Sequence, residues 1–228
     1  VAAWPSYKVI SFHAEGEKIA SAIALAARYK RPIHICHVSR KEDIERIASA
    51  KAAGLPITCE VTPHHLFLTR ADADRLGALG DMRPRLAEQR DVDALWAHLG
   101  TTIDIIASDH APHTLQEKND PVSSPPGVPG LESTLPLMLT AVSQKRLKMQ
   151  RLLELLYTNP ARIYGLAHQP DTFLEIDPCA RYTFPEYPLH TKCGWSPFSS
   201  MQMVGRLIRV VLRGRTVYVD GLLTDPKE

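Results

Sequence analysis

The chain has 228 residues, of which 44% are hydrophobic and 23% charged, and its formal net charge is +2. This length and composition predict one globular domain, or one domain with a small appendage. The balanced charge, without a dominant cluster of lysine and arginine, argues against a nucleic-acid-binding protein. The sequence shows no apolar run of membrane-spanning length and no N-terminal signal pattern, so we expect no membrane contact.

The cysteines are scattered and lack the CxxC spacing of a zinc ribbon. They are Cys36, Cys59, Cys179 and Cys193. Four scattered thiols in a chain of this composition are typical of a reducing compartment. We therefore expect a cytoplasmic protein.

Strand and helix signals alternate over the first 160 residues. Apolar, β-branched runs predict strands at 7–12, 32–38, 56–61 and 103–108. Apolar residues at helical spacing predict helices at 17–29, 39–53, 70–79, 91–99, 132–143 and 149–156. Ser39, with Glu42 three residues later, predicts a capping box at the start of the second helix. The alternation indicates parallel βαβ units.

Two later stretches differ from this pattern. Residues 115–130 are rich in proline and glycine, and loops of this length usually have a function. Residues 173–176, 182–184 and 206–219 alternate apolar and polar side chains, and Asp220-Gly221 is a turn signal. The tail therefore predicts antiparallel strands of a small appended sheet.

Each of the four predicted parallel strands ends at a residue that can bind a metal. These residues are His13, Cys36 with His37, Glu60, and Asp109 within Ser108-Asp109-His110-Ala111-Pro112-His113. In a β/α barrel, side chains at the carboxyl ends of strands form the active site. Histidine, cysteine and carboxylates are zinc ligands, so this pattern predicts a catalytic zinc site.

The second strand carries more candidates than an ideal strand can aim at one site. Cys36 and His37 point to opposite faces of a regular strand, so both reach the site only if the strand bends there. His34 should lie on the strand's other phase, and we interpret it as structural.

Donor groups follow just beyond the strand ends, at His65, Arg83 and His113. Together with a metal, they suggest capture of a substrate carboxylate, because arginine offers a planar fork of donors. Alone, Arg83 could be a cation at a helix end. Pro126-Gly127 lets backbone groups approach a ligand closely, or else forms a rigid surface loop.

Several long motifs together make the chain resemble the dihydroorotases of the amidohydrolase superfamily, in particular the dihydroorotase domain of the animal-type multifunctional pyrimidine-synthesis polypeptide. The motifs are His34-Ile-Cys-His-Val38, Thr58-Cys-Glu-Val-Thr-Pro-His-His-Leu66, Met82-Arg-Pro84, Ala107-Ser-Asp-His-Ala-Pro-His-Thr114, Pro126-Gly-Val-Pro-Gly-Leu-Glu132, Asn159-Pro160, Trp195-Ser-Pro-Phe198 and Val210-Val-Leu-Arg-Gly214. They cover nearly the whole chain.

The resemblance implies an α/β fold: strands 5–8, the C-terminal half of a TIM-like (β/α)8 metal-dependent barrel, in residues 1–168, and part of a small β-sandwich in 169–228. It implies reversible cyclisation of N-carbamoyl-L-aspartate to dihydroorotate by a metal-bridged hydroxide. His13 and His37 resemble ligands of one zinc ion, and Asp109 a ligand of the other and the general acid/base. Cys36 and Glu60 resemble ligands of a third zinc. The substrate-binding set would be His65, Arg83, His113, Pro126 and Gly127.

Other family features have no counterpart in this sequence. The His-x-His of the first barrel strand and the bridging carboxylated lysine of the fourth are absent, so we expect the N-terminal half of the barrel as a partner. The resemblance also implies a homodimer that associates with other pyrimidine-pathway domains. The alternatives are a cyclic-amide hydrolase of the hydantoinase or allantoinase type, and a catalytically dead homologue that serves as a structural or assembly domain.

Overall fold

The computed structural model describes residues 4, 5 and 7–224, which form two four-stranded sheets. The parallel sheet contains β1 (Ile10–Phe12), β2 (Ile33–Ile35), β3 (Ile57–Val61) and β4 (Ile105–Ile106), adjacent in that order. The antiparallel sheet contains β5 (Phe173–Thr183), β6 (Gln202–Leu212), β7 (Arg215–Val219) and β8 (Leu222–Leu223). The predicted parallel units and antiparallel tail are therefore confirmed.

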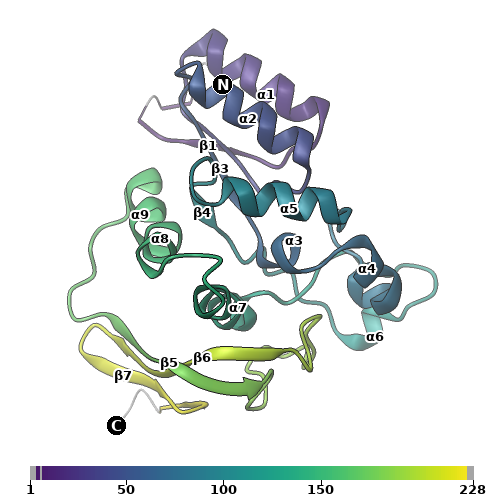
Figure 1. Ribbon diagram of the computed structural model, residues 1–228, viewed down its shortest axis with the longest axis vertical. Helices are drawn as coiled ribbons and strands as arrows, with labels where there is room; N and C mark the ends of the chain where they lie inside the picture. Colours follow the sequence, from purple (N-terminus) through teal and green to yellow (C-terminus); the bar gives the residue numbers. More distant parts are fainter. Residues whose placement is uncertain (1–3, 6, 225–228) are drawn as a thin grey trace.

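Helices connect the strands of the parallel sheet and then lead to the antiparallel sheet. They are α1 (Glu17–Tyr29), α2 (Lys41–Ala52), α3 (Pro63–Phe67), α4 (Arg70–Leu76), the 3-10 helix η1 (Gly77–Gly80), α5 (Gln89–His98), α6 (Leu115–Lys118), α7 (Leu131–Ser143), α8 (Met149–Leu153), the π-helix η2 (Glu154–Thr158) and α9 (Asn159–Tyr164). Figure 1 shows α7 between the two sheets, with α1 and α2 at the end of the molecule far from the antiparallel sheet. Among the described residues, no helix has the length and apolar character needed to cross a bilayer.

The parallel sheet has one apolar and one polar face. The apolar face is buried against the helices and carries Ile33, Ile35, Ile57, Cys59 and Val61. Because alternate side chains of a strand point to opposite faces, the residues between them project together on the other side. The strand register places Ser11, His34 and Thr58 side by side there, with Glu60 two residues further along β3. This polar face leads to the strand ends.

The two outer strands of the parallel sheet are free on one side. Among the described residues, β1 and β4 each pair with one neighbour only. The strand predicted at 103–108 is therefore reduced to Ile105–Ile106, although Asp104 N and Ala107 N still donate to Cys59 O and Val61 O, at 2.9 and 3.0 Å. An unpaired strand edge is a template for further pairing.

The predicted capping box at Ser39 is wrong. Helix α2 begins after Arg40, and the buried Ser39 hydroxyl has no hydrogen-bond partner. Instead, the Asp91 carboxylate of the neighbouring α5 accepts from the backbone N of Lys41, at 2.9 Å. A tertiary contact thus satisfies the first amide of the helix, and the local pattern could not reveal it.

Helix α7 joins the two sheets into one packed unit. The Thr140 hydroxyl accepts from the backbone N of Val204 in β6 at 2.9 Å. A Cβ added to Gly205 would lie 2.7 Å from the Cβ of Leu139, so only glycine lets the strand approach the helix this closely. The antiparallel sheet is therefore held against the helix that follows the loop at residues 115–130.

The strands of the tail are divided differently from the prediction. The stretch predicted at 206–219 contains the end of β6, the turn at Arg213-Gly214 and all of β7. The strands predicted at 173–176 and 182–184 are parts of one strand, β5, with a register shift between Asp177 and Arg181. The Asp177 carboxylate accepts from the backbone N of Cys179 and Ala180, at 2.9 and 3.2 Å, which bends the strand locally. The residues of this bend, which include Asp177-Pro178, are typical of a turn between two strands, so the sequence pattern predicted two strands here.

Candidate functional site

The carboxyl ends of β1, β2 and β4 meet at a cavity of about 170 Å³. His13, His37 and Asp109 line it, each just after its strand. The rings of His13 and His37 form a hydrogen bond, with 2.6 Å between His13 Nδ1 and His37 Nε2. Three of the predicted strand-end residues are thus brought together.

The backbone bends at two of these three residues. His37 and Asp109 have φ angles of 37° and 44°, in the left-handed region that non-glycine residues rarely adopt. Such strain costs on the order of 1 kcal/mol or more per residue and clusters at functional sites. The chain therefore bends just after β2, which is the condition under which Cys36 and His37 could both face the site.

The Asp109 turn is supported from α7. The His110 ring accepts from the backbone N of Gly130 and Leu131, both at 3.2 Å, and so satisfies the first amides of that helix. A Cβ on Gly130 would lie 2.3 Å from Ser108 O, so this close approach requires glycine. His110 therefore has a structural role beside the site.

Burial sets the protonation of the cavity residues. It lowers the pKa of His37 below its ordinary value, although the Asp109 carboxylate acts in the opposite direction. The imidazole is then neutral at pH 7, which is the form that binds metals. Burial also raises the pKa of Asp109, with His37 opposing and the Glu60 carboxylate reinforcing the shift. A carboxyl group shifted toward neutrality is suited to proton transfer.

Cys36 and Glu60 form a second group beside the cavity, together with His34. Burial, together with the charges of Glu60 and Asp109, raises the pKa of the Cys36 thiol to about 12. The thiol is thus protonated at pH 7 unless a cation displaces the proton.

His34 is fully buried, and its Nε2 lies 3.0 Å from Glu60 Oε2 while its Nδ1 lies 2.8 Å from Thr58 Oγ1. His34 therefore shares the face of Cys36 and Glu60 and fixes the Glu60 carboxylate.

Part of the predicted substrate-binding set lines the same cavity. Arg83, Pro126 and Gly127 lie on its wall. Arg83 Nη1 donates to Asp81 Oδ1 at 2.5 Å, and the side chain is 41% exposed, which leaves other guanidinium donors free for an anion. Gly127 has a φ of 137°, and an added Cβ would lie 2.6 Å from Ala111 O. The backbone at Gly127 therefore closes one side of the cavity.

His65 and His113 lie behind this wall. Both ring nitrogens of His65 are engaged, with Thr62 Oγ1 at 2.7 Å and Pro84 O at 3.0 Å, and burial lowers its pKa to about 4. Half-buried His113 lies against Gly127, and its backbone O accepts from the indole N of Trp195 at 2.7 Å. Neither ring lines the cavity, so their predicted contact with substrate stays a prediction.

Sequence reasoning missed His64, which does line the cavity. It is 1% exposed, and neither ring nitrogen has a hydrogen-bond partner. Buried polar groups without partners are rare and point to a ligand or water. The only available signal was its position beside His65, and spacing alone does not show which of two adjacent histidines faces a site.

The donor types in the cavity fit zinc, but the set in this chain is partial. Imidazole and carboxylate are common zinc ligands, and two ring nitrogens already converge. Within residues 4, 5 and 7–224, however, no group of three or more histidine, cysteine or acidic side chains is arranged to hold a metal ion. Among the described residues, the cavity therefore contains side chains of the types that bind zinc but no complete ligand set.

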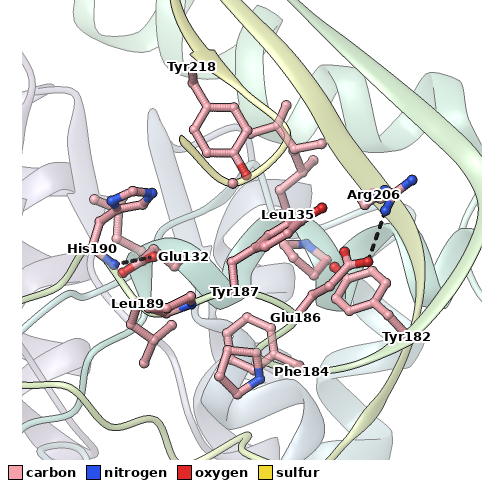
Figure 2. A pocket seen from close by; sticks show the side chains of 16 residues that line it. Glu132, Leu135, Tyr182, Phe184, Glu186, Tyr187, Leu189, His190, Arg206 and Tyr218 are labelled. Atoms are coloured by element: carbon pink, nitrogen blue, oxygen red, sulfur yellow. Dashed lines mark hydrogen bonds and ion pairs between the residues drawn. The ribbon is translucent and has the colours of Figure 1, made fainter. Parts of the chain in front are cut away.

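A larger cavity of about 300 Å³ lies elsewhere, between α7 and the antiparallel sheet (Figure 2). Its walls are mainly apolar and aromatic. Both of its carboxylates are engaged, since Glu186 pairs with Arg206 at 2.9 Å and Glu132 accepts from the backbone N of His190 at 3.0 Å. It contains none of the strand-end residues, so the smaller cavity is the candidate site.

Known sequences match nearly the entire chain. It is 47% identical to the multifunctional protein CAD of Squalus acanthias over 98% of its own length and 10% of that protein. It is 35% identical to the dihydroorotase of Pyrococcus furiosus over 90% of its length and 49% of that enzyme. The chain thus spans about half of such a dihydroorotase and a tenth of the multifunctional protein. No protein-family model matches it.

Solved structures confirm the fold class. The inactive dihydroorotase-like domain of the Chaetomium thermophilum CAD-like multifunctional protein aligns with a TM-score of 0.82 and 31% identity, covering 97% of this chain and 61% of that one. A D-hydantoinase aligns with a TM-score of 0.86 and 28% identity, covering 92% of this chain and 50% of that one. The chain therefore has the fold of the C-terminal part of an amidohydrolase barrel with its small β-domain.

Proposed function

We propose that this chain, whose sequence matches the C-terminal part of dihydroorotases, forms one side of a zinc-dependent active site that interconverts N-carbamoyl-L-aspartate and dihydroorotate. One observation carries the proposal. A single cavity brings His13, His37 and Asp109 next to Arg83 and Gly127. Metal donors, a carboxyl group suited to proton transfer and an anion-binding cation are what hydrolysis of a cyclic amide with a carboxylate substituent requires.

His13, His37 and Asp109 would hold zinc on this side of the site. When bound, zinc polarises the amide carbonyl and makes water a nucleophile at neutral pH. Cys36 and Glu60 would hold a further ion, and the contribution of the Glu60 charge to the raised pKa of the Cys36 thiol supports their being neighbours. His34 would keep the Glu60 carboxylate in place through its hydrogen bond.

Asp109 would carry the proton. In the hydrolytic direction its carboxylate takes a proton from the attacking water and passes it to the leaving ring nitrogen; in the biosynthetic direction the transfers reverse. Burial raises the pKa of Asp109, which makes its carboxylate a stronger base and favours the first step, removal of the water proton.

Arg83 and the backbone around Gly127 would orient the substrate. The free guanidinium donors of Arg83 suit a carboxylate, and the close backbone at Gly127 limits the space beside it. His64, with two unpaired ring nitrogens on the same wall, is available to hydrogen-bond a polar group of the substrate. These residues contribute orientation rather than bond breaking.

The remaining ligands would come from the part of the relatives that this chain does not match. The free edges of β1 and β4 offer backbone pairing to further barrel strands. Residues 1–168 would then form half of the barrel and 169–228 part of the β-sandwich, of which 225–228 lie outside the described residues. A homodimer, association with other pyrimidine-pathway domains and a cytoplasmic location remain proposals from the resemblance.

Two alternatives have specific support. The similarity to an inactive dihydroorotase-like domain favours a catalytically dead assembly domain, and the similarity to a D-hydantoinase favours another cyclic-amide substrate. The grouping of His13, His37 and Asp109 argues against a catalytically dead domain, because these residue types can bind metal and transfer a proton. Arg83 on the cavity wall argues against a hydantoinase-type substrate, because its guanidinium suits a substrate carboxylate.

A substrate assay separates these readings. The full-length polypeptide containing this chain is assayed with N-carbamoyl-L-aspartate, dihydroorotate and hydantoin, before and after zinc chelation. The proposal predicts turnover of the first two substrates, loss on chelation and recovery with zinc. Absent turnover in the zinc-loaded protein supports the assembly domain, and preference for hydantoin supports the other hydrolase; either result contradicts the proposal.

A further inference from the structure

Lys118 is a fully buried lysine at the end of α6, inside the loop at residues 115–130. Its ammonium donates to two backbone carbonyls, Asp81 O at 3.0 Å and Pro125 O at 2.9 Å. A buried cation is costly unless hydrogen bonds replace its hydration, so these two bonds fix where both carbonyls lie.

The two carbonyls belong to the loops that line the candidate site. Asp81 lies two residues before Arg83, and its carboxylate pairs with the Arg83 guanidinium. Pro125 directly precedes Pro126 and Gly127. Asp81 O also accepts from the backbone N of Gly127, at 2.9 Å. Lys118 therefore links the loop that carries Arg83 to the loop that carries Gly127, both of which line the cavity.

Helix α6 holds Lys118 at a fixed place relative to the site. It begins immediately after Thr114, whose hydroxyl forms a capping box with Glu117. The hydroxyl of Ser124 donates to Lys118 O at 2.8 Å, which closes the loop back on the helix. The helix that carries Lys118 is thus fixed by its cap at Thr114 and by the Ser124 hydrogen bond to its last residue.

We propose that Lys118 is a positioning residue, which sets the spacing between Arg83 and the Gly127 backbone and so shapes the subsite for the substrate carboxylate. This inference rests on the proposed function. Without the ammonium, Pro125 O loses its hydrogen-bond donor and Asp81 O keeps only the backbone N of Gly127. The two loops then lose one of the hydrogen-bonded links that join them. Neither bond involves Asp109, so substrate binding weakens while proton transfer is retained.

The test compares Lys118→Met with Lys51→Met in the zinc-loaded full-length protein. Lys51 is a matched control, because its ammonium also binds a backbone carbonyl, Thr102 O, and the Asp104 carboxylate, both at 2.7 Å. Asp104 precedes β4, at the opposite end of the sheet from the cavity. Lys118→Met is expected to raise KM for N-carbamoyl-L-aspartate on the order of tenfold with kcat within about twofold. Lys51→Met should leave KM unchanged.

The outcomes separate this inference from the proposed function. A wild-type protein without turnover contradicts the function itself. An active wild type whose Lys118→Met variant is folded, by circular dichroism, but keeps its KM overturns the positioning role, as does a loss confined to kcat. If Lys118→Met does not fold, Lys118→Gln retains a donor for one carbonyl and should show a smaller rise in KM. Failure of both variants to fold also overturns the proposal, because Lys118 would then serve the fold alone.

Discussion

His13 Nδ1 and His37 Nε2 lie 2.6 Å apart, although the two residues are 24 positions apart in the chain. Their strands are parallel neighbours, and the left-handed bend at His37 accompanies the meeting of the two rings at the strand ends. The hydrogen bond requires one protonated and one unprotonated nitrogen. A cation that binds both nitrogens must displace that proton, so metal binding and protonation compete here.

The first prediction concerns Asp109. Asp109→Asn should lower kcat about a thousandfold, because general acid/base catalysis contributes on the order of 10² to 10⁴ and the amide cannot exchange the proton. Folding should survive, since burial already disfavours the charged carboxylate. Steady-state kinetics with a urea-unfolding curve checks both parts. Exposed Asp93, mutated to Asn, is the control, and unaltered turnover in Asp109→Asn would rule out the assigned role.

The second prediction concerns Arg83. Arg83→Ala should raise KM for the carboxylate substrate by about tenfold or more while kcat changes less, because the guanidinium binds the part of the substrate that does not react. Arg83→Lys should recover only part of the affinity, since an ammonium lacks the planar fork. Arg90→Ala removes another arginine that pairs with a carboxylate, Glu42, away from the cavity and should have no effect. An equal KM in Arg83→Ala and wild type would contradict the role.

The third prediction tests the close backbone at Gly127. Gly127→Ala adds a Cβ where the φ is 137° and Ala111 O would lie 2.6 Å away, so the loop must shift. The free energy of unfolding should fall by about 1–3 kcal/mol and KM should rise. Gly100→Ala is the control, since no atom lies within 4 Å of its added Cβ. Urea unfolding and kinetics provide the readouts, and matching results for both variants would refute the crowding argument.

The fourth prediction is loss of stability in mild acid. Burial lowers the pKa of His65 to about 4, and that of His64 well below its ordinary value. The unfolded chain therefore binds more protons than the folded one below about pH 6.5, and stability falls as the pH drops toward 4. His65 alone should contribute a loss of about 2 kcal/mol between pH 7 and pH 5.

Urea unfolding at the two pH values measures this loss. His65→Asn should flatten the pH dependence, whereas His168→Asn at an exposed position should not. An unchanged pH dependence in His65→Asn would show that His65 does not titrate as its burial implies.

Sequence patterns predicted the parallel units because apolar runs and helical spacing are local signals. They also placed His13, His37 and Asp109 at one edge, since parallel strands end together. Sequence patterns could not predict the cap of α2, because Asp91 supplies it from another helix. The side of β2 on which His34 acts depends on its pairing with Thr58, and the choice between His64 and His65 depends on how α3 is oriented. Such facts arise only from tertiary packing.

The central claim is that the His13–His37–Asp109 cavity is one side of a zinc site. Anomalous scattering at the zinc edge, from crystals of the zinc-loaded full-length protein, tests it directly. The claim predicts an anomalous peak within about 2.0–2.3 Å of ligand atoms of His13 and His37, a distance typical of zinc coordination. A zinc-loaded, active protein whose peaks touch neither histidine would contradict it.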